Sequence, residues 1–343
     1  MSDSSEFEER AMWFLHRVDP VGRKLRYVHA IPSALRAATF LDGRTTFWEG
    51  TERVVDFAQA QPSGTGGGSI RYIFHVSFCG STLLASVLDE ACEAFVLKEP
   101  QCLVDLADWK KTLRQHHATD PAFGGILDVV QEALLIPGQA TVVKPSNWAN
   151  NIVADLCSSR RSAERLFLTM DAESFLRAVF RGGRDRIAFT ARVAGHLASA
   201  FGGGQGLVAQ AISETADPLG RAANLCALTH YLQLSLFEAA CPDWKDSGSH
   251  LDFAEISGDL EGAVRKAAAA LGLTLSDALL LRALDRWQER NAKQHQAVFS
   301  KAAHAEADMM IGRVHGKHIA DALRWADGLQ LPAAQPPLDH LPV

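Results

Sequence analysis

The alternation of apolar and polar positions predicts strands and helices in turn over most of the chain. Residues 70–76 form a short run rich in β-branched and aromatic side chains, and this run enters a tight loop at residues 77–80. Beyond the loop, leucine and valine recur at helical spacing and predict an amphipathic helix over residues 81–92. The chain therefore offers a strand, a glycine-containing loop and a helix in direct succession.

The same pattern continues downstream. Further strands are predicted at residues 95–98, 140–144, 165–170 and 249–256. Helices are predicted at residues 101–116, 122–135, 148–157, 173–181, most of 185–241, and 277–304 as the longest. Strands joined by helices favour a parallel sheet with right-handed crossovers. We therefore expect an α/β fold of P-loop type, with residues 70–76 as a central strand, flanking helices and a helix-rich carboxyl half.

A glycine- and serine-rich stretch at residues 61–69 reads as an exposed link or loop. The residues before it, 1–60, are too few to bury a large hydrophobic core, so they do not predict an independent domain. They contain strand-like pieces at 25–30 and 44–48. We expect this extension to pack on the main domain, residues 70–330.

Composition and charge narrow the functional classes. The chain has 343 residues, 47% of them apolar, and a net charge of −6, which argues against general nucleic-acid or membrane-surface binding. No apolar run approaches the ~20 residues of a transmembrane helix, and the first residues are acidic where a signal peptide would be basic. The six cysteines show no metal-binding spacing and read as reduced thiols, so we expect a cytoplasmic protein without a metal.

The loop after the first strand has the chemistry of an anion site. Free backbone N–H groups and the positive end of a helix dipole meet there, and such a point binds an anion, usually a phosphate. Gly80 permits close backbone approach, and the hydroxyls of Ser81 and Thr82 can add donors. The alternative is an ordinary helix cap. Cys79 is either a reactive thiol whose pKa is lowered by the helix N-terminus or a small residue that fills the loop.

The loop lacks the groups that a nucleoside triphosphate needs. A triphosphatase loop reads G-x-x-x-x-G-K-[ST], and its lysine reaches the β- and γ-phosphates. Here Ser81 stands at the lysine position and Phe74 at the first glycine position. The loop therefore suits a nucleotide with a shorter phosphate chain.

Residues 74–84, Phe-His-Val-Ser-Phe-Cys-Gly-Ser-Thr-Leu-Leu, resemble the 5′-phosphosulfate loop of sulfotransferases, which ends in [KR]-x-G-[ST]-T-[LW]. The similarity is greatest to a bacterial sulfotransferase-like group and runs from about residue 70 to 325, although only the loop is specific. Sulfotransferases use a P-loop architecture to bind 3′-phosphoadenosine-5′-phosphosulfate (PAPS). The resemblance therefore implies PAPS as the donor, bound by Phe78, Cys79, Gly80, Ser81 and Thr82.

The resemblance also implies catalytic residues at two strand ends. In tyrosylprotein sulfotransferases a Glu after the second strand is the general base, and Glu99 follows position 78 by the matching 21 residues. Alternatively, Glu99 only pairs with Lys98 or caps a helix. Lys144 matches the Lys of the cytosolic Lys-Thr-His element, where it would stabilise developing charge, but Ser146 replaces the His. Alternatively, Lys144 is a solvated side chain at the sheet edge.

The third strand end departs from the family pattern. Asp171 lies where sulfotransferases read Arg-Asp-Pro-Arg, but Met170 replaces the Arg and Ala178 the Ser that together hold the 3′-phosphate. Phe78 likewise replaces the Lys or Arg of the loop. Arg177 and Arg181, one helical turn apart, could substitute in binding the 3′-phosphate.

Two classes of function remain open. The first is a PAPS-dependent sulfotransferase that acts on a hydroxyl or amine of an unknown small-molecule or peptide acceptor. The second is a P-loop-fold nucleotide- or phosphate-binding protein without that activity, or an atypical small-molecule kinase. A preference for adenosine 3′,5′-bisphosphate over AMP and ATP would distinguish them. The sequence does not define the oligomeric state.

Overall fold

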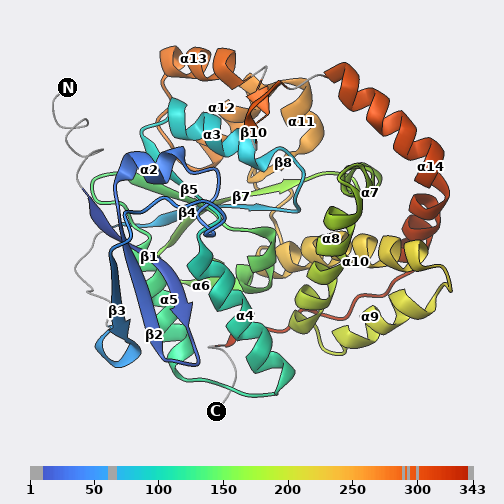
Figure 1. Cartoon of the computed structure of the whole chain (residues 1–343), viewed down its shortest axis with the longest axis horizontal. Helices are drawn as coiled ribbons and strands as arrows, with labels where there is room; N and C mark the ends of the chain where they lie inside the picture. Colours follow the sequence, from blue (N-terminus) through green and yellow to red (C-terminus); the bar gives the residue numbers. More distant parts are fainter. Residues whose placement is uncertain (1–10, 61–67, 288–289, 292–293, 299–300, 339–343) are drawn as a thin grey trace.

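The computed structural model describes residues 11–60, 68–287, 290–291, 294–298 and 301–338. Its largest sheet has five strands in the order β5-β6-β4-β7-β8, and every neighbouring pair is parallel. These strands are β4 (Ile70–His75), β5 (Ala94–Lys98), β6 (Ala140–Lys144), β7 (Ser162–Thr169) and β8 (His250–Asp252). The predicted parallel α/β sheet is confirmed, and β4 lies at its centre (Figure 1).

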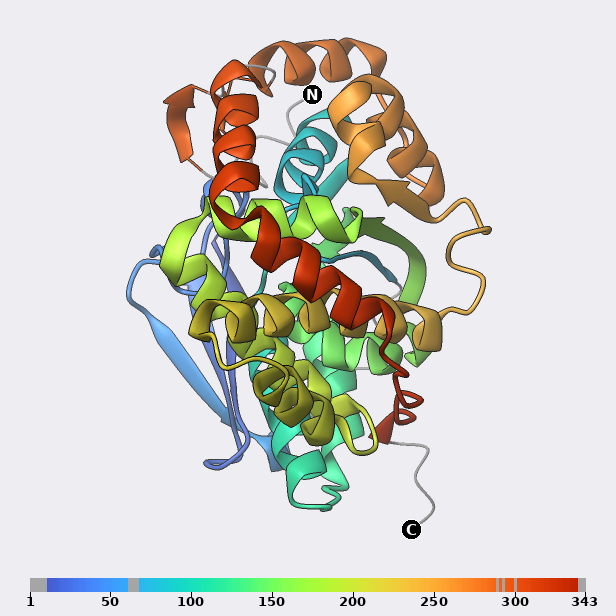
Figure 2. The same ribbon diagram turned by 90° about the vertical axis from the view of Figure 1, so that its right-hand side faces the viewer.

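Helices cover both faces of this sheet (Figure 1). One face carries α3 (Ser81–Ala91), α11 (Phe253–Gly258), α12 (Leu260–Ala270) and α13 (Asp277–Trp287). The other carries α4 (Gln101–Gln115), α5 (Ala122–Ala133), α6 (Val153–Ser158), α8 (Gly183–Leu197) and α10 (Pro218–Ala240). The remaining long helices are α7 (Ala172–Arg181), α9 (Gly204–Ser213) and α14 (Lys301–Asp327). Figure 2 shows α14 crossing over α7 and α10. Among the described residues, none of the helices combines the length and the apolar character that a bilayer span requires.

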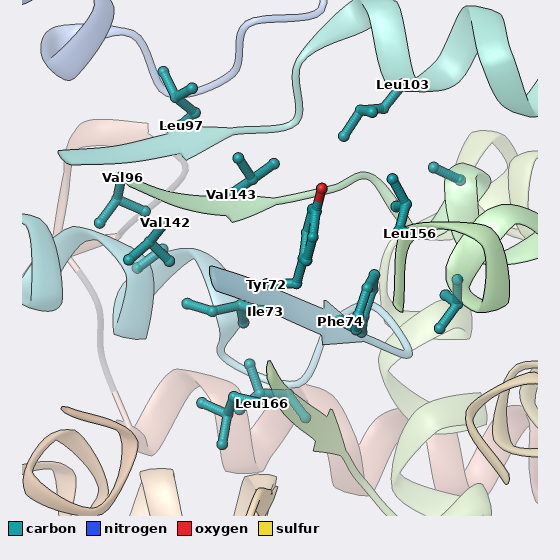
Figure 3. Packing of buried hydrophobic residues seen from close by; sticks show 14 of the residues in the cluster. Tyr72, Ile73, Phe74, Val96, Leu97, Leu103, Val142, Val143, Leu156 and Leu166 are labelled. Atoms are coloured by element: carbon teal, nitrogen blue, oxygen red, sulfur yellow. The ribbon is translucent and has the colours of Figure 1, made fainter. Parts of the chain in front are cut away.

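The central strands are buried on both faces, which explains their near-continuous apolar sequence. Tyr72 and Phe74 project to one face of β4, where their rings stack with centroids 5.3 Å apart. Figure 3 shows these rings packed among side chains of the neighbouring strands and of α4 and α6. The Tyr72 hydroxyl accepts a hydrogen bond from Gln131 Nε2 at 2.8 Å, so its polar end is satisfied inside the core.

Residues 11–60 form a second, antiparallel sheet with the order β1-β2-β3. Its elements are β1 (Met12–Asp19), β2 (Lys24–Ala30), β3 (Glu52–Asp56) and the short helix α2 (Pro32–Ala37). Buried side chains of this sheet belong to the same hydrophobic cluster as those of the main sheet. The strand expected at 25–30 is present as β2. The segments 1–10 and 61–67, which include most of the expected link at 61–69, lie outside the described residues.

The strand expected at residues 44–48 is wrong, because these residues form an irregular loop. Alternation along a strand would send the neighbouring rings of Phe47 and Trp48 to opposite faces. Instead the two rings contact each other, with centroids 5.0 Å apart, and both pack against His16. Packing of these aromatic side chains overrides the local strand preference.

Two expectations near the carboxyl end are also wrong. The strand expected at 249–256 is only β8, because Asp252 and Glu255 form a capping box that begins α11. The helix expected at 277–304 ends at Trp287, and the longest helix is α14 with 27 residues. The apolar stripe through Leu284 and Trp287 meets polar residues at its next helical positions, 291 and 294, and the described part of this stretch holds β9 (Arg290–Asn291) and β10 (Gln294–Val298).

A buried ion pair joins α4 to α6. Lys110 Nζ lies 2.5 Å from Asp155 Oδ2, and both side chains are less than 5% exposed. Removing one partner of such a pair leaves an uncompensated charge in the interior. We expect Lys110→Met to lower the free energy of unfolding by about 3–5 kcal/mol in a urea titration. The double variant Lys110→Met/Asp155→Leu should recover much of this loss; no recovery would contradict a balanced pair.

Candidate functional site

The loop between β4 and α3 has a strained backbone. Ser77, Phe78 and Gly80 all have positive φ, at 75°, 57° and 77°. For residues other than glycine this conformation costs of order 1–3 kcal/mol each, and such strain persists where the surrounding structure enforces it, often at ligand sites. Successive turns of this kind present backbone N–H groups toward one point and form an anion-binding concavity.

Buried polar side chains hold the start of this loop in place. Ser77 N donates to Nδ1 of His75 at 3.1 Å, and Val76 N donates to the Leu168 carbonyl at 3.1 Å. Asn150 Nδ2 donates to the His75 carbonyl, and Gln233 Nε2 donates to the Val76 carbonyl. The last two side chains also hydrogen-bond each other at 3.0 Å. The backbone leading into the loop is therefore fixed before any ligand arrives.

Gly80 ends the loop as the residue before α3. Its φ of 77° is the left-handed conformation that glycine adopts most readily. A Cβ at this position would also lie 3.2 Å from Cγ2 of Ile256 and 3.5 Å from the ring of Phe253, both on α11. Both the backbone and the packing therefore require glycine here.

Ser81 and Thr82 open the first turn of α3, as the sequence predicts. Each residue is only 5% exposed. In the part of the chain that the structure describes, neither hydroxyl forms a hydrogen bond with another residue. Two hydroxyl donors without a protein acceptor, on nearly buried residues at the start of a helix, suit an anionic ligand.

Of the two interpretations of Cys79, the reactive thiol with a lowered pKa is wrong. The thiol is fully buried, and burial raises its pKa to about 11 despite nearby backbone N–H groups. Its Sγ lies 3.7 Å from the Leu168 carbonyl, which it faces as a weak donor. Cys79 therefore fills the space under the loop, which was the alternative left open by the sequence.

Glu99 and Lys144 meet at the carboxyl edge of the sheet. Because Lys98 pairs with Lys144 in the register of β5 and β6, the next residue, Glu99, lies beside the end of β6. Lys144 Nζ lies 2.7 Å from Glu99 Oε1, and Glu99 N donates to the Lys144 carbonyl at 2.7 Å. The Lys144 side chain is fully buried and that of Glu99 is 12% exposed. Lys144 is thus not a solvated side chain, and Glu99 pairs with Lys144 rather than with Lys98.

Two further residues complete this cluster, and sequence reasoning missed both. Arg44, from the amino-terminal extension, lies 3.3 Å from Glu99 Oε2 and stacks on the ring of Phe40. His75 ends β4 and lies 3.3 Å from Lys144 Nζ. Since His75 Nδ1 accepts from Ser77 N, its Nε2 carries the proton of the neutral ring and donates to the Pro145 carbonyl at 3.0 Å. His75 therefore lies between the loop and the Lys144–Glu99 pair, but its Nε2 is a donor and accepts no hydrogen bond from Lys144.

The other predicted cofactor-binding residue, Asp171, and the two arginines predicted to substitute at the 3′-phosphate lie apart from this cluster. Asp171 caps α7 by accepting from Ser174 N at 2.8 Å; burial raises its pKa, but the hydrogen bonds from Ser174 bring it below its usual value. Arg177 pairs with Glu173 at 2.6 Å and donates to the Asp308 carbonyl. Arg181 pairs with the Asp308 carboxylate. Both arginines are thus engaged with α7 and α14.

The positions that bind the 3′-phosphate in sulfotransferases are apolar and packed here. Met170 and Ala178 are 4% and 2% exposed. The Met170 carbonyl accepts a hydrogen bond from Nε2 of His230 at 2.8 Å. A 3′-phosphate would therefore need different donors in this protein.

Two cavities lie away from the loop. The first, of about 210 Å³, lies between α2, α3, β5 and α13 and is lined by Arg36, Ala37, Ser86, Asp89, Glu90, Lys98, Arg286 and Trp287. The second, of about 620 Å³, lies between the amino-terminal sheet and α5 and is lined by Arg23, Asp56, Phe57, Ala58, Ala60, Ala122, Gly125 and Ile126. Over the described ranges, no cluster of three or more His, Cys, Asp or Glu side chains is arranged to hold a metal ion.

Comparison with known proteins finds similarity among solved structures but none among sequences. No protein-family profile matches the sequence, and no curated protein sequence matches it. Among solved structures, the fold is similar to the sulfotransferase domain from the curacin biosynthetic pathway, with a TM-score of 0.40 and 13% sequence identity. The match covers 79% of this chain and 94% of that domain. A TM-score of 0.40 and an identity of 13% are too low to assign an activity or a ligand to this chain.

The loop geometry gives a direct test. Gly80→Val places a β-branched residue at a left-handed φ and against Ile256, so the loop must change shape. We expect calorimetric binding of adenosine 3′,5′-bisphosphate to fall below detection while circular dichroism still reports a folded chain. Gly138→Val is the matched control, since Gly138 has a φ of 72° with open space around its Cβ position. Equal binding by wild type and Gly80→Val would refute the loop as the anion site.

Proposed function

We propose that the chain binds an adenine nucleotide with a 5′-phosphosulfate group and transfers the sulfuryl group to a hydroxyl or amine. The observation that carries the proposal is the loop at residues 76–82, whose sequence resembles a 5′-phosphosulfate loop and whose backbone has the turned, strained form of an anion-binding concavity. Ser81 and Thr82, each only 5% exposed, add two hydroxyls that have no protein acceptor among the described residues.

In this reaction the acceptor oxygen attacks the sulfur, and the bond between sulfur and the bridging oxygen of the 5′-phosphate breaks. The sulfuryl group moves to the acceptor, the acceptor proton moves to a base, and the nucleotide leaves as the 3′,5′-bisphosphate. Negative charge grows on the bridging oxygen as this bond breaks, and a nearby cation stabilises it. We assign that role to Lys144, which the sheet holds rigidly at the end of β6.

Glu99 is the proton acceptor in this scheme. Its Oε1 is occupied by Lys144 at 2.7 Å, whereas among the described residues its Oε2 has only the longer 3.3 Å contact with Arg44. The Arg44 side chain is 57% exposed, so an acceptor can displace it from Oε2. Lys144 would then orient the carboxylate while Oε2 takes the proton.

A second candidate is a nucleotide- or phosphate-binding protein without sulfuryl transfer. The buried apolar Met170 and Ala178 favour it, because these positions supply the 3′-phosphate ligands in sulfotransferases. Calorimetric titration with adenosine 3′,5′-bisphosphate, AMP and ATP separates the two candidates. Tightest binding of the bisphosphate supports the first; equal or tighter binding of AMP supports the second.

The role of Glu99 is tested by transfer of radiolabelled sulfuryl from PAPS to a panel of phenol, carbohydrate and peptide acceptors. Glu99→Gln removes the basic oxygen, so we expect turnover to fall by about 10²–10⁴-fold while bisphosphate affinity stays near that of the wild type. Glu99→Asp keeps the charge beside Lys144 but moves the carboxylate, and it should also lose most activity. If Glu99→Asp is fully active, or Glu99→Gln retains most turnover, Glu99 is only the counter-ion of Lys144.

A further inference from the structure

Arg186, in the first turn of α8, places its guanidinium against the loop. Its Cζ lies 4.8 Å from the centroid of the Phe78 ring, and its Nη1 donates to the Ala178 carbonyl at 2.8 Å. Phe78 also packs on Phe175 of α7, with centroids 5.9 Å apart. The guanidinium thus stacks on Phe78, the loop residue that stands where sulfotransferases have a Lys or Arg.

The neighbouring backbone makes room for this arginine. Gly182 has a φ of −78°, which any residue adopts, so its conformation does not require glycine. A Cβ on Gly182, however, would lie 2.0 Å from Arg186 Nε. Glycine at 182 is therefore explained by the position of the Arg186 side chain, which could not lie where it does beside a larger residue.

Arg186 carries a positive charge that the protein does not balance. Within the described ranges no carboxylate lies within ion-pairing distance of it, and the Ala178 carbonyl is its one hydrogen-bond acceptor. Burial and the nearby Arg181 both lower the pKa of Arg186, so the guanidinium is held in a place that disfavours charge. Arg181, in contrast, is paired with Asp308. A half-buried guanidinium of this kind, beside an anion-binding loop, fits an anionic ligand.

We propose that Arg186 is the cation for the phosphate or sulfuryl group held by residues 78–82. It takes over the role that a Lys or Arg at position 78 has in sulfotransferases, and Phe78 serves as the platform on which it stacks. The proposal rests on the proposed function for the identity of the nucleotide. The role of Arg186 toward an anion does not depend on the proposed function, because any phosphate bound in the loop would meet the same charge.

The test uses the full chain and two probes, adenosine 3′,5′-bisphosphate and inorganic phosphate, measured by calorimetry and by thermal shift. Arg186→Gln should weaken binding of both by about tenfold to a hundredfold, since a charge-assisted hydrogen bond to phosphate is lost. Arg184→Gln, an exposed position on the same helix, is the matched control and should bind like the wild type. Gly182→Ala, which displaces Arg186, should weaken binding in the same direction.

Two measurements distinguish anion binding by Arg186 from a merely structural role: rescue by a second variant and the salt dependence of the affinity. Phe78→Lys in the Arg186→Gln background returns a cation to the loop and should restore at least part of the affinity. The loss of affinity between low and high salt should be steeper in the wild type than in Arg186→Gln, because one charge interaction is screened. Unchanged binding by Arg186→Gln, or no rescue together with equal salt dependence, overturns the proposal.

The two proposals fail in different ways. If the wild type binds the bisphosphate and Arg186→Gln binds it equally well, the role of Arg186 is refuted and the proposed function stands. If phosphate binding depends on Arg186 but the bisphosphate binds no better than AMP, the proposed function fails and the role of Arg186 stands. If the wild type binds neither probe, both are refuted.

Discussion

The candidate site depends on one buried ammonium group, that of Lys144. A charge with no exposure to water must be balanced inside the protein, and Glu99 Oε1 balances it at 2.7 Å. This requirement fixes the ends of β5 and β6 relative to each other. His75, at the end of β4, lies 3.3 Å from the same nitrogen and donates to the Pro145 carbonyl. Three neighbouring strands therefore end at one polar cluster, and His75 also accepts a hydrogen bond from Ser77 N in the loop.

Side chains behind the loop explain its strained backbone. Positive φ at Ser77 and Phe78 would relax if the loop were free, so the structure must enforce it. The enforcement comes from side chains behind the loop, on β4, the 3-10 helix at Asn147–Ile152 and α10, and not from the loop itself. If the loop binds an anion as proposed, it loses little freedom on binding, which is the general source of affinity in preorganised sites.

The sequence predicts the parts of this arrangement that are local or that follow from strand order. Apolar periodicity locates β4 and α3. Because β5 and β6 are parallel, Glu99, which follows β5, and Lys144, which ends β6, come to one edge of the sheet. His75, Arg44 and Arg186 escape such reasoning, because their roles arise from contacts between elements distant in the chain. The sequence leaves both interpretations of Cys79 open for the same reason: the helix N-terminus is visible in the sequence, but complete burial of the thiol is not. No signal in the sequence singles out Arg186, because the φ that leaves glycine at 182 without a backbone reason is known only from the structure.

The central claim is that residues 78–82 hold the phosphate end of an adenine nucleotide beside Lys144 and Glu99. A crystal structure of the chain with adenosine 3′,5′-bisphosphate tests it most directly. The account predicts the 5′-phosphate within hydrogen-bond distance of the backbone N–H groups of Cys79 to Thr82 and of the Ser81 or Thr82 hydroxyl. A phosphate bound elsewhere, making no hydrogen bond with these N–H groups and hydroxyls, would contradict the account.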